Sequence, residues 1–168
     1  MNVPLTRQKY KLGCGAAALS MVMQYFGDEI SEKDIVKYCG GFKSYGLKTT
    51  DLARFAREKG YKVECLTFNL DRADGMATLK TPKTQDIIRF LKKNIPVIIN
   101  VNVSALRNTA PNNRGHFLVI NDYKNGRFYY NDPSRKYGGK FSMNYDSLLF
   151  AWFTNVLDSS AYFLAIWK

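Results

Sequence analysis

Cys14 stands between two glycines, directly before an apolar and alanine-rich stretch that continues to about residue 25. Ala18 and Met21 recur in that stretch at helical spacing and Gly27 can stop a helix, so we expect a helix over 14–25. The start of a helix leaves backbone N–H groups unpaired and carries partial positive charge, and both favour a thiolate over a thiol. The pKa of a cysteine placed there can fall well below the free value of about 8.5. The pattern therefore predicts a nucleophile at a helix start, and the rest of the chain has to supply its base.

The length of 168 residues suits a single domain with a core of its own. The net charge of +11 is high for this size, but the lysines and arginines are spread along the chain without a block of like charges. We therefore expect no nucleic-acid partner, and a charge that biases which peptides or proteins approach. No apolar run reaches the roughly 18 residues of a membrane span, and the first residues carry no secretory signal. The oligomeric state stays open.

The three cysteines, Cys14, Cys39 and Cys65, are an odd number and lack the spacing of paired metal ligands. This argues against a disulfide framework and against a zinc site, so we expect a reducing, cytoplasmic location and no bound metal. Cys39 and Cys65 are interpreted as buried apolar residues. No glycine-rich phosphate loop is present, and no cofactor is expected.

The expected elements fall into two groups along the chain. Helices dominate residues 1–60 and strands dominate residues 61–168, with Asn125-Gly126 as the clearest hairpin turn. Residues 104–115 are interpreted as a polar loop and residues 132–140 as a glycine-rich loop. The order predicts an α+β domain with a helical lobe packed on a mostly antiparallel sheet lobe. Helices are expected over 14–25, after Ser31, after Thr49 or Thr50, after Thr84 and over 144–154; strands are expected over 61–68, 96–103, 116–123, 127–131 and 161–167.

His116 is the only histidine of the chain, and it opens a strand directly after the polar loop. It is the only imidazole that could serve Cys14 as a general base. A lone histidine is more often structural than catalytic, but a position beside a polar loop favours an active site. The group that orients this imidazole should be a carboxylate or an amide, and Asp132 at the end of the next strand is the candidate.

The pairing register of the hairpin decides whether Asp132 can reach His116. In a hairpin with a two-residue turn at 125–126, paired residues have numbers that add to 251. Asp132 would then pair with Val119 and lie on the opposite face of the hairpin from His116. One extra residue changes that sum to 250 and sets Asp132 opposite Leu118, on the face of His116. We therefore expect an odd-length turn or a bulge, such as one at Gly126. The alternative is that Asp132 only begins an Asp-Pro turn.

Three motifs of the chain together resemble the C39 peptidase group. They are Gln-x5-Cys-Gly-x-Ala-x-Leu-x-Met from Gln8, His-Phe-x-Val from His116, and Asp-Pro sixteen residues after that histidine. The group consists of papain-like cysteine peptidase domains, and the best known are fused to bacterial ABC transporters that remove double-glycine leader peptides. One departure is Gly13, because the transporter-linked members usually have aspartate before the cysteine. The resemblance covers most of the chain and implies a papain-like fold.

Carried onto this sequence, the resemblance implies a role for each motif residue. Cys14 would be the nucleophile, His116 its base and later its acid, and Asp132 the group that holds the imidazole. Gln8 and the backbone N–H of the cysteine would form the oxyanion hole. The implied reaction is hydrolysis of a peptide bond through a thioester, with cleavage after Gly-Gly as the family precedent. The implied groove between the helices and the sheet would be lined by Gly15, Tyr45, Gly46, Arg114 and Gly115.

Two other interpretations use the same residues. A papain-like acyltransferase or deamidase would form the same thioester and pass the acyl group to a different acceptor. A papain-like domain that binds peptides without cleaving them would be a binding module, and the complete set of motif residues argues against it. In each case the partner is a peptide or a protein, and the shape of the groove decides the acceptor.

Overall fold

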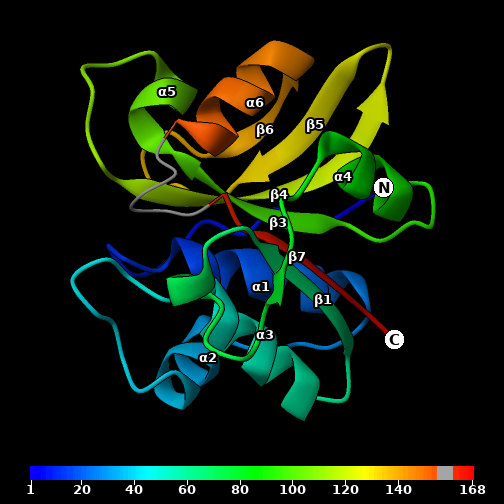
Figure 1. The fold of residues 1–168 in the computed structure, drawn as a ribbon. Helices are drawn as coiled ribbons and strands as arrows, with labels where there is room; N and C mark the ends of the chain where they lie inside the picture. The colour runs from blue at the N-terminus through cyan, green and yellow to red at the C-terminus, as the bar shows by residue number, and fades with distance from the viewer. Residues whose placement is uncertain (155–160) are drawn as a thin grey trace.

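The fold is built on one seven-stranded sheet with helices on both of its faces (Figure 1). The computed structural model describes residues 1–154 and 161–168. In the described part, the strands follow the order β2-β1-β7-β3-β4-β5-β6, and all neighbours are antiparallel except β1 and β2. The predicted α+β class with a mostly antiparallel sheet is confirmed. The strands are β1 (Lys62–Thr67), β2 (Thr78–Leu79), β3 (Val97–Asn102), β4 (Gly115–Lys124), β5 (Arg127–Asp132), β6 (Gly139–Asn144) and β7 (Phe163–Trp167).

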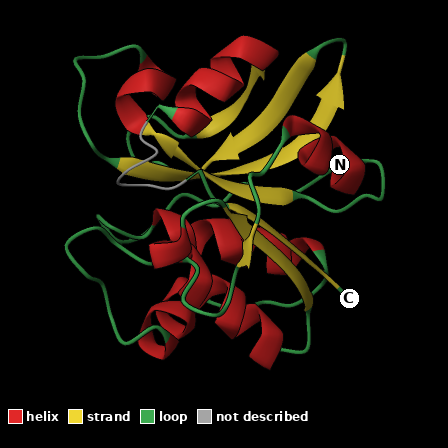
Figure 2. Ribbon diagram, in the orientation of Figure 1, coloured by secondary structure: helices red, strands yellow, loops and turns green. Residues whose placement is uncertain are grey.

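The helices form a layer on each side of the strands, as the red and yellow ribbons of Figure 2 show. Three of them precede the first strand and three lie between later strands. The division into two lobes near residue 60 stays a prediction. No helix among the described residues is long and apolar enough to cross a membrane. The helices are α1 (Cys14–Tyr25), α2 (Glu32–Tyr38), α3 (Thr49–Glu58), α4 (Thr84–Leu91), α5 (Val103–Arg107) and α6 (Tyr145–Phe153), with a short 3-10 helix η1 (Leu70–Arg72).

Alternate positions of the central strands enter two separate cores. On β4, Phe117 and Val119 pack with side chains of α1 and α3, whereas Leu118 and Ile120 pack with side chains of α4 and α6. All four are buried. A strand that is apolar on both faces needs cover on both sides. This is why the middle of β4 is a continuous apolar run rather than an alternating pattern.

The hairpin of β4 and β5 contains an extra residue, as predicted, but at a different place. Asn125 and Gly126 both have positive φ and form a two-residue turn. This turn matches the natural twist of the two strands. The register shifts instead on either side of Asn121, which is the bulged residue. The expectation of a bulge at Gly126 is therefore wrong.

The bulge sets the face on which Asp132 lies. Beyond it, Val119 pairs with Asn131, so the pairing sum has changed to 250. The next pair in this register sets Asp132 opposite Leu118, on the face of His116. The predicted relation between the two site residues therefore holds, although its cause is a bulge inside β4.

Helix starts follow the capping residues in α2 and α6 and depart from them in α3 and α4. The side chains of Ser31 and Asn144 each accept a backbone N–H from the first turn of α2 and α6. In α3 the N-cap is Lys48, and Thr49 and Thr50 lie inside the first turn, where both are buried. The prediction that a threonine caps α3 is wrong, because the Thr50 hydroxyl donates to a carboxylate of a following loop instead. The N-cap of α4 is Lys83 and Thr84 is its first residue, so the expectation that Thr84 caps this helix is also wrong.

Two short elements occupy segments that were expected to be loops. α5 fills the first part of 104–115, because the Asn102 side chain accepts the Ala105 N–H and starts a helical turn. β6 begins at Gly139, inside the expected glycine-rich loop, and pairs with β5 along its whole length. A five-residue helix and an edge strand have too few residues to produce a clear period in the sequence.

Asn131 ties the N-terminal segment to the sheet. Its side chain is fully buried, and Nδ2 donates to the carbonyls of Val3 and Pro4 at 3.1 and 3.2 Å. Its Oδ1 accepts from Asn121 Nδ2 at 3.0 Å, so the same amide also supports the bulge. Both polar atoms of this amide are therefore paired in an interior where unpaired polar groups are costly.

The variant Asn131→Ala should lower the free energy of unfolding by about 3 kcal/mol, because two backbone carbonyls and one buried amide lose their partner. Urea denaturation followed by tryptophan fluorescence measures this change. Asn113→Ala is the matched control, since Asn113 is exposed, and it should change the stability by less than about 0.5 kcal/mol. Equal stability of the two variants would contradict a stabilising role for the hydrogen bonds of Asn131.

Candidate active site

Cys14 is the first residue of α1, and a glycine on each side sets its surroundings. Gly13 is the N-cap of the helix. A side-chain carbon at Gly15 would lie 3.1 Å from the ring of Phe117 on β4, which is too close for ordinary packing. Glycine therefore lets the start of α1 lie directly against β4. The backbone N–H groups of Gly15 and Phe117 both hydrogen-bond to the Cys14 sulfur.

His116, the second residue of β4, lies between Cys14 and Asp132. Its side chain hydrogen-bonds with the Cys14 sulfur, and its Nε2 lies 2.6 Å from Asp132 Oδ1. Because the carboxylate occupies Nε2, the other ring nitrogen, Nδ1, faces the sulfur. His116 is only 6% exposed, so protein groups cover most of its ring. The structure thus brings together the three residues that the sequence analysis assigned to a base-activated thiol.

The pKa of the Cys14 thiol lies below its ordinary value of 9.0. Burial raises this pKa, but the hydrogen bond to His116 and the charge of the imidazole lower it by more. The two backbone N–H groups at the sulfur act in the same direction. The thiolate is therefore the favoured form at lower pH than for a free cysteine.

The pKa of His116 moves in the opposite direction. Burial lowers it, but the hydrogen bonds to Asp132 and Cys14 raise it to about 9. Burial also raises the pKa of Asp132, and the hydrogen bond and charge of His116 bring it below its ordinary value of 3.8. Between the lowered pKa of the thiol and about 9 for the imidazole, the favoured state is a thiolate beside an imidazolium, with Asp132 ionised.

The other two thiols differ from Cys14 in their surroundings. Burial raises the pKa of Cys65 to about 12, in agreement with its interpretation as an apolar core residue. Cys39 is only partly buried, contrary to expectation, because it ends α2 near the surface. Burial and the charge of Asp51 nevertheless raise the pKa of Cys39 to about 12. Cys14 is thus the only one of the three cysteines poised for nucleophilic attack.

Arg107, at the end of α5, holds the second oxygen of Asp132. Its Nη2 lies 3.0 Å from Asp132 Oδ2, while the backbone N–H of Ser134 donates to Oδ1 at 2.8 Å. The guanidinium also stacks on the ring of Tyr137, 4.8 Å from its centroid. Arg107 was not predicted as a site residue, because residues 104–115 were expected to form a loop and no motif marks an arginine there.

Gln8 lines the same groove as the nucleophile. Its Nε2 donates to the carbonyls of Tyr10 and Lys11 at 2.8 and 3.0 Å, and its backbone N–H donates to the Pro133 carbonyl at 2.8 Å. The amide therefore shapes the turn that leads into α1, and the backbone ties this turn to the loop after β5. Both Nε2 hydrogens have carbonyl partners in this state, so donation to an oxyanion requires one of them to change partner.

A buried carboxylate on α2 supports the same turn. Both oxygens of Glu32 lie 3.1 Å from the backbone nitrogen of Lys9. A side-chain carbon at Gly13 would lie 3.0 Å from this carboxylate. Burial raises the pKa of Glu32. Glycine directly before the nucleophile therefore makes room for a carboxylate that comes from another helix.

A groove of about 1050 Å³ opens over the nucleophile and the imidazole. Its walls are the turn before α1, the loop around Tyr45, the loop before β4 and the loop after β5. Three of the residues expected to line it, Tyr45, Arg114 and Gly115, do so. Tyr45 is 59% exposed, so its ring is available to a ligand.

Two glycines expected in the groove lie behind its walls instead. Gly15 is buried in the contact of α1 with β4. Gly46 has a φ of +97°, and a side-chain carbon there would lie 3.2 Å from the Leu12 carbonyl oxygen. Neither is a lining residue, because both are needed for close backbone packing.

The arrangement is chemically that of a thiol nucleophile with a hydrogen-bonded base and a carboxylate that orients the base. Such a set serves acyl transfer, in which the sulfur attacks a carbonyl carbon. Within residues 1–154 and 161–168, no group of three or more histidine, cysteine or acidic side chains is placed to hold a metal ion.

Several solved structures share this fold. A Bacillus anthracis protein assigned as a C39-like peptidase is 18% identical with a TM-score of 0.73, and the match covers 99% of this chain and 95% of the other. The peptidase domain of Streptococcus ComA, a bi-functional ABC transporter involved in quorum sensing, is 15% identical with a TM-score of 0.67, covering 99% and 97%. A double glycine motif protease from an AMS/PCAT transporter, solved in complex with the leader peptide, is 20% identical with a TM-score of 0.63, covering 98% and 91%.

At such low identities these structures show a shared fold. No curated protein matches the sequence. The model of the Peptidase_C39 like family matches residues 1–159, which is nearly the whole chain. The sheet and helices of this protein agree with the papain-like architecture of the C39 peptidase domains. The chain therefore belongs to the Peptidase_C39 like family.

Proposed function

We propose that this protein is a cysteine peptidase that hydrolyses a peptide bond through a thioester on Cys14. The observation that carries the proposal is the hydrogen-bonded chain from Cys14 through His116 to Asp132 beside an open groove. The lowered pKa of the thiol and the raised pKa of the imidazole support a thiolate–imidazolium pair. Membership in the family and the peptidase domains among the structural neighbours agree with this chemistry.

In the first half of the proposed reaction, the Cys14 sulfur attacks the carbonyl carbon of the scissile bond. The C–N bond then breaks while the His116 imidazolium gives its proton to the leaving amine. The fragment with the new amino terminus departs, and the acyl group remains on sulfur as a thioester. Asp132 holds Nε2 of the ring, so Nδ1 stays directed at the reacting atoms.

In the second half, water replaces the departed amine. Neutral His116 takes a proton from this water, and the water oxygen attacks the thioester carbonyl. The C–S bond breaks, the carboxylic acid product leaves, and the thiolate–imidazolium pair is restored. One water is consumed for each peptide bond cleaved.

The oxyanion of each tetrahedral intermediate would be bound by the Cys14 backbone N–H and the Gln8 amide. In this role Gln8 releases the longer of its two bonds, that to the Lys11 carbonyl, and turns one hydrogen to the oxyanion. The bond to the Tyr10 carbonyl keeps the amide in place. The cost of releasing one partner is offset when the charged oxygen forms, so the exchange favours the transition state.

The proposed substrate is a peptide or an extended protein segment. A structural neighbour is a double glycine motif protease in complex with the leader peptide, so peptides that contain Gly-Gly are the first to test. Cleavage after Gly-Gly is the corresponding proposal for the site of attack. A reducing compartment such as the cytoplasm would keep the Cys14 thiol free for this reaction.

Peptides with a central Gly-Gly should be cleaved by the wild-type protein and not by Cys14→Ala, which lacks the nucleophile. Asp132→Asn should lower kcat/KM by about 1000-fold, because the ring loses its orienting carboxylate. Liquid chromatography with mass spectrometry measures cleavage, and an acid quench preserves the acyl adduct on Cys14 for detection. Cys39→Ala is the matched control and should keep full activity, since the pKa of Cys39 is raised to about 12.

Failure to detect either cleavage or an adduct, with Gly-Gly peptides and with a broad peptide mixture, would contradict the proposed hydrolysis. An adduct that water leaves intact but an added amine releases would contradict water as the acceptor. That result would favour the acyltransferase alternative.

Arg107→Gln should lower kcat/KM at neutral pH by about tenfold and move the acid limb of the pH–rate profile to higher pH. The reason is that Asp132 loses the cation at Oδ2, so its pKa rises and the carboxylate is protonated earlier on acidification. Arg127→Gln is the control, because among the residues that the structure describes the Arg127 side chain hydrogen-bonds only to Ser142 on the outer strands. Identical pH–rate profiles for the two variants would rule out a positioning role for Arg107.

A further inference from the structure

The groove over the nucleophile carries positive charge without a matching negative charge. Its described lining includes Lys11, Arg107 and Arg114 but no aspartate or glutamate. We propose that this groove selects substrates that carry carboxylates beside the scissile bond, that is, acidic peptide segments. The inference rests on the proposed peptidase function and deepens it by naming a substrate class.

Lys11 and Arg114 are the two lining cations that are free to meet a substrate. Both are exposed, and neither side chain forms an ion pair with any residue that the structure describes. They come from different walls, the turn before α1 and the loop before β4. Lys11 precedes Cys14 by three residues, and Arg114 precedes His116 by two. Both cations therefore line the same groove as the two reacting side chains, one on each wall.

The acidic groups nearest to the site are already paired with other partners. Asp132 binds the imidazole and Arg107, and it thereby balances the charge of that arginine. Glu32 accepts a backbone N–H of the turn before α1. Neither carboxylate lines the groove, so the charges of Lys11 and Arg114 remain uncompensated.

The rims of the groove add more basic side chains. Lys43 lies directly before the lining pair 44–45, and Arg135 and Lys136 lie within the bordering segment 134–137. Both rim loops lack acidic residues. Positive charge therefore surrounds the path of a bound peptide on the side of the α1 turn and on the side of the sheet loops.

Charges that flank a concave site act more strongly than charges on a flat surface, because the protein walls focus the field. A single charge about 8 Å away in water-like surroundings changes the rate of reaction with an anion by about two-fold. Carboxylates near the scissile bond would gain from several such charges at once. Lysine or arginine at the same substrate positions would be repelled.

Two alkylating agents that differ in charge test this without any peptide substrate. Iodoacetate is an anion and iodoacetamide is neutral, and each forms a bond from its methylene carbon to the Cys14 sulfur as iodide leaves. Mass spectrometry of the intact chain gives the rate constant for each reagent. Because both reagents attack the same thiolate, a variant that changes the fraction of thiolate changes both rate constants alike and leaves their ratio unaffected. The double variant Lys11→Gln/Arg114→Gln should lower the ratio of iodoacetate to iodoacetamide about four-fold at low salt.

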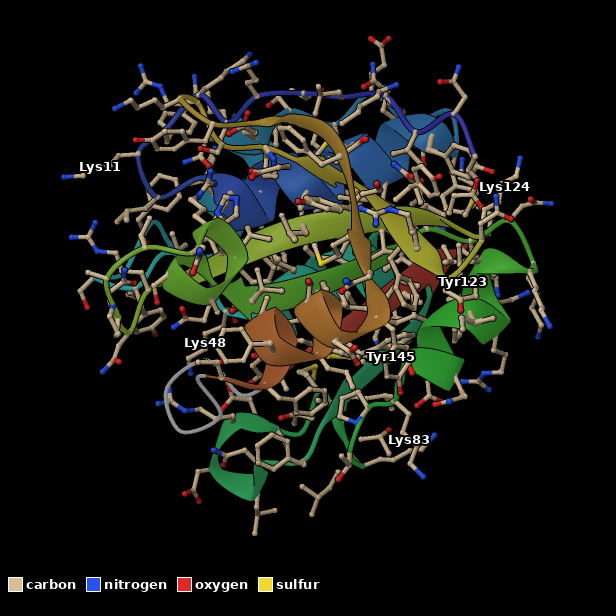
Figure 3. All side chains as sticks on the ribbon, turned by 90° about the horizontal axis from the view of Figure 1, so that it is seen from above. Lys11, Lys48, Lys83, Tyr123, Lys124 and Tyr145 are labelled. Atoms are coloured by element: carbon tan, nitrogen blue, oxygen red, sulfur yellow. The ribbon has the colours of Figure 1, made fainter. Side chains whose placement is uncertain are left out.

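The double variant Lys83→Gln/Lys124→Gln is the matched control, since it removes the same charge at exposed positions. In Figure 3, Lys124 lies at the opposite edge of the molecule from Lys11, and Lys83 also lies toward the edge away from Lys11. This control should leave the ratio unchanged. An unchanged ratio in the groove variant, or an equal fall in both variants, overturns the inference.

Peptides separate this inference from the proposed function. For a peptide that the protein cleaves, replacing glutamates beside the scissile bond by glutamine should lower kcat/KM several-fold, and the groove variant should lose that difference. If peptides are cleaved without this preference and the alkylation ratio does not respond, the inference fails while the peptidase proposal stands. If the ratio responds but no peptide of either series is cleaved, the selection of anions stands and the peptidase proposal fails.

Discussion

The candidate site depends on the contact between His116 Nε2 and Asp132 Oδ1, because it fixes the ring and keeps the imidazole charged beside Cys14. That contact depends in turn on strand register. Without the bulged Asn121, the two-residue turn would set Asp132 on the other face of the hairpin, away from His116. The buried amide of Asn131 holds both this bulge and the N-terminal segment, so a structural residue of the sheet helps to place the site.

Separate parts of the chain converge on this contact, each through one specific interaction. α1 reaches β4 because Gly15 has no side chain to meet Phe117. α5 brings Arg107 to Asp132, and the loop after β5 accepts the backbone N–H of Gln8. The contact of Gly15 with Phe117 belongs to the core between α1 and β4, whereas the other interactions lie at the ends of helices and strands, outside the two apolar cores. Core packing positions the elements, and a hydrogen-bonded and charged network between their ends sets the geometry of the site.

The features that the sequence predicted are those with strong local signals. The apolar period and the flanking glycines located Cys14 at the start of α1, and the requirement for a shared face predicted the extra residue between His116 and Asp132. The position of the bulge could not be predicted, because it depends on the pairing of Asn121 with a buried amide on the neighbouring strand. Arg107 was missed for a related reason: its partner lies 25 residues further along the chain, and its own helix is too short to show a period.

The proposed chemistry requires that Cys14 and His116 form a thiolate–imidazolium pair in the free protein. The pH dependence of alkylation by iodoacetamide at each cysteine tests it most directly, with Cys39 and Cys65 as internal controls. Cys14 should react rapidly well below pH 9, and its rate should change again near pH 9 as the imidazolium loses its proton. His116→Ala should move the half-point of the Cys14 reaction up to that of an ordinary thiol. A Cys14 that reacts only as the pH approaches 9, with or without His116, would contradict this pair.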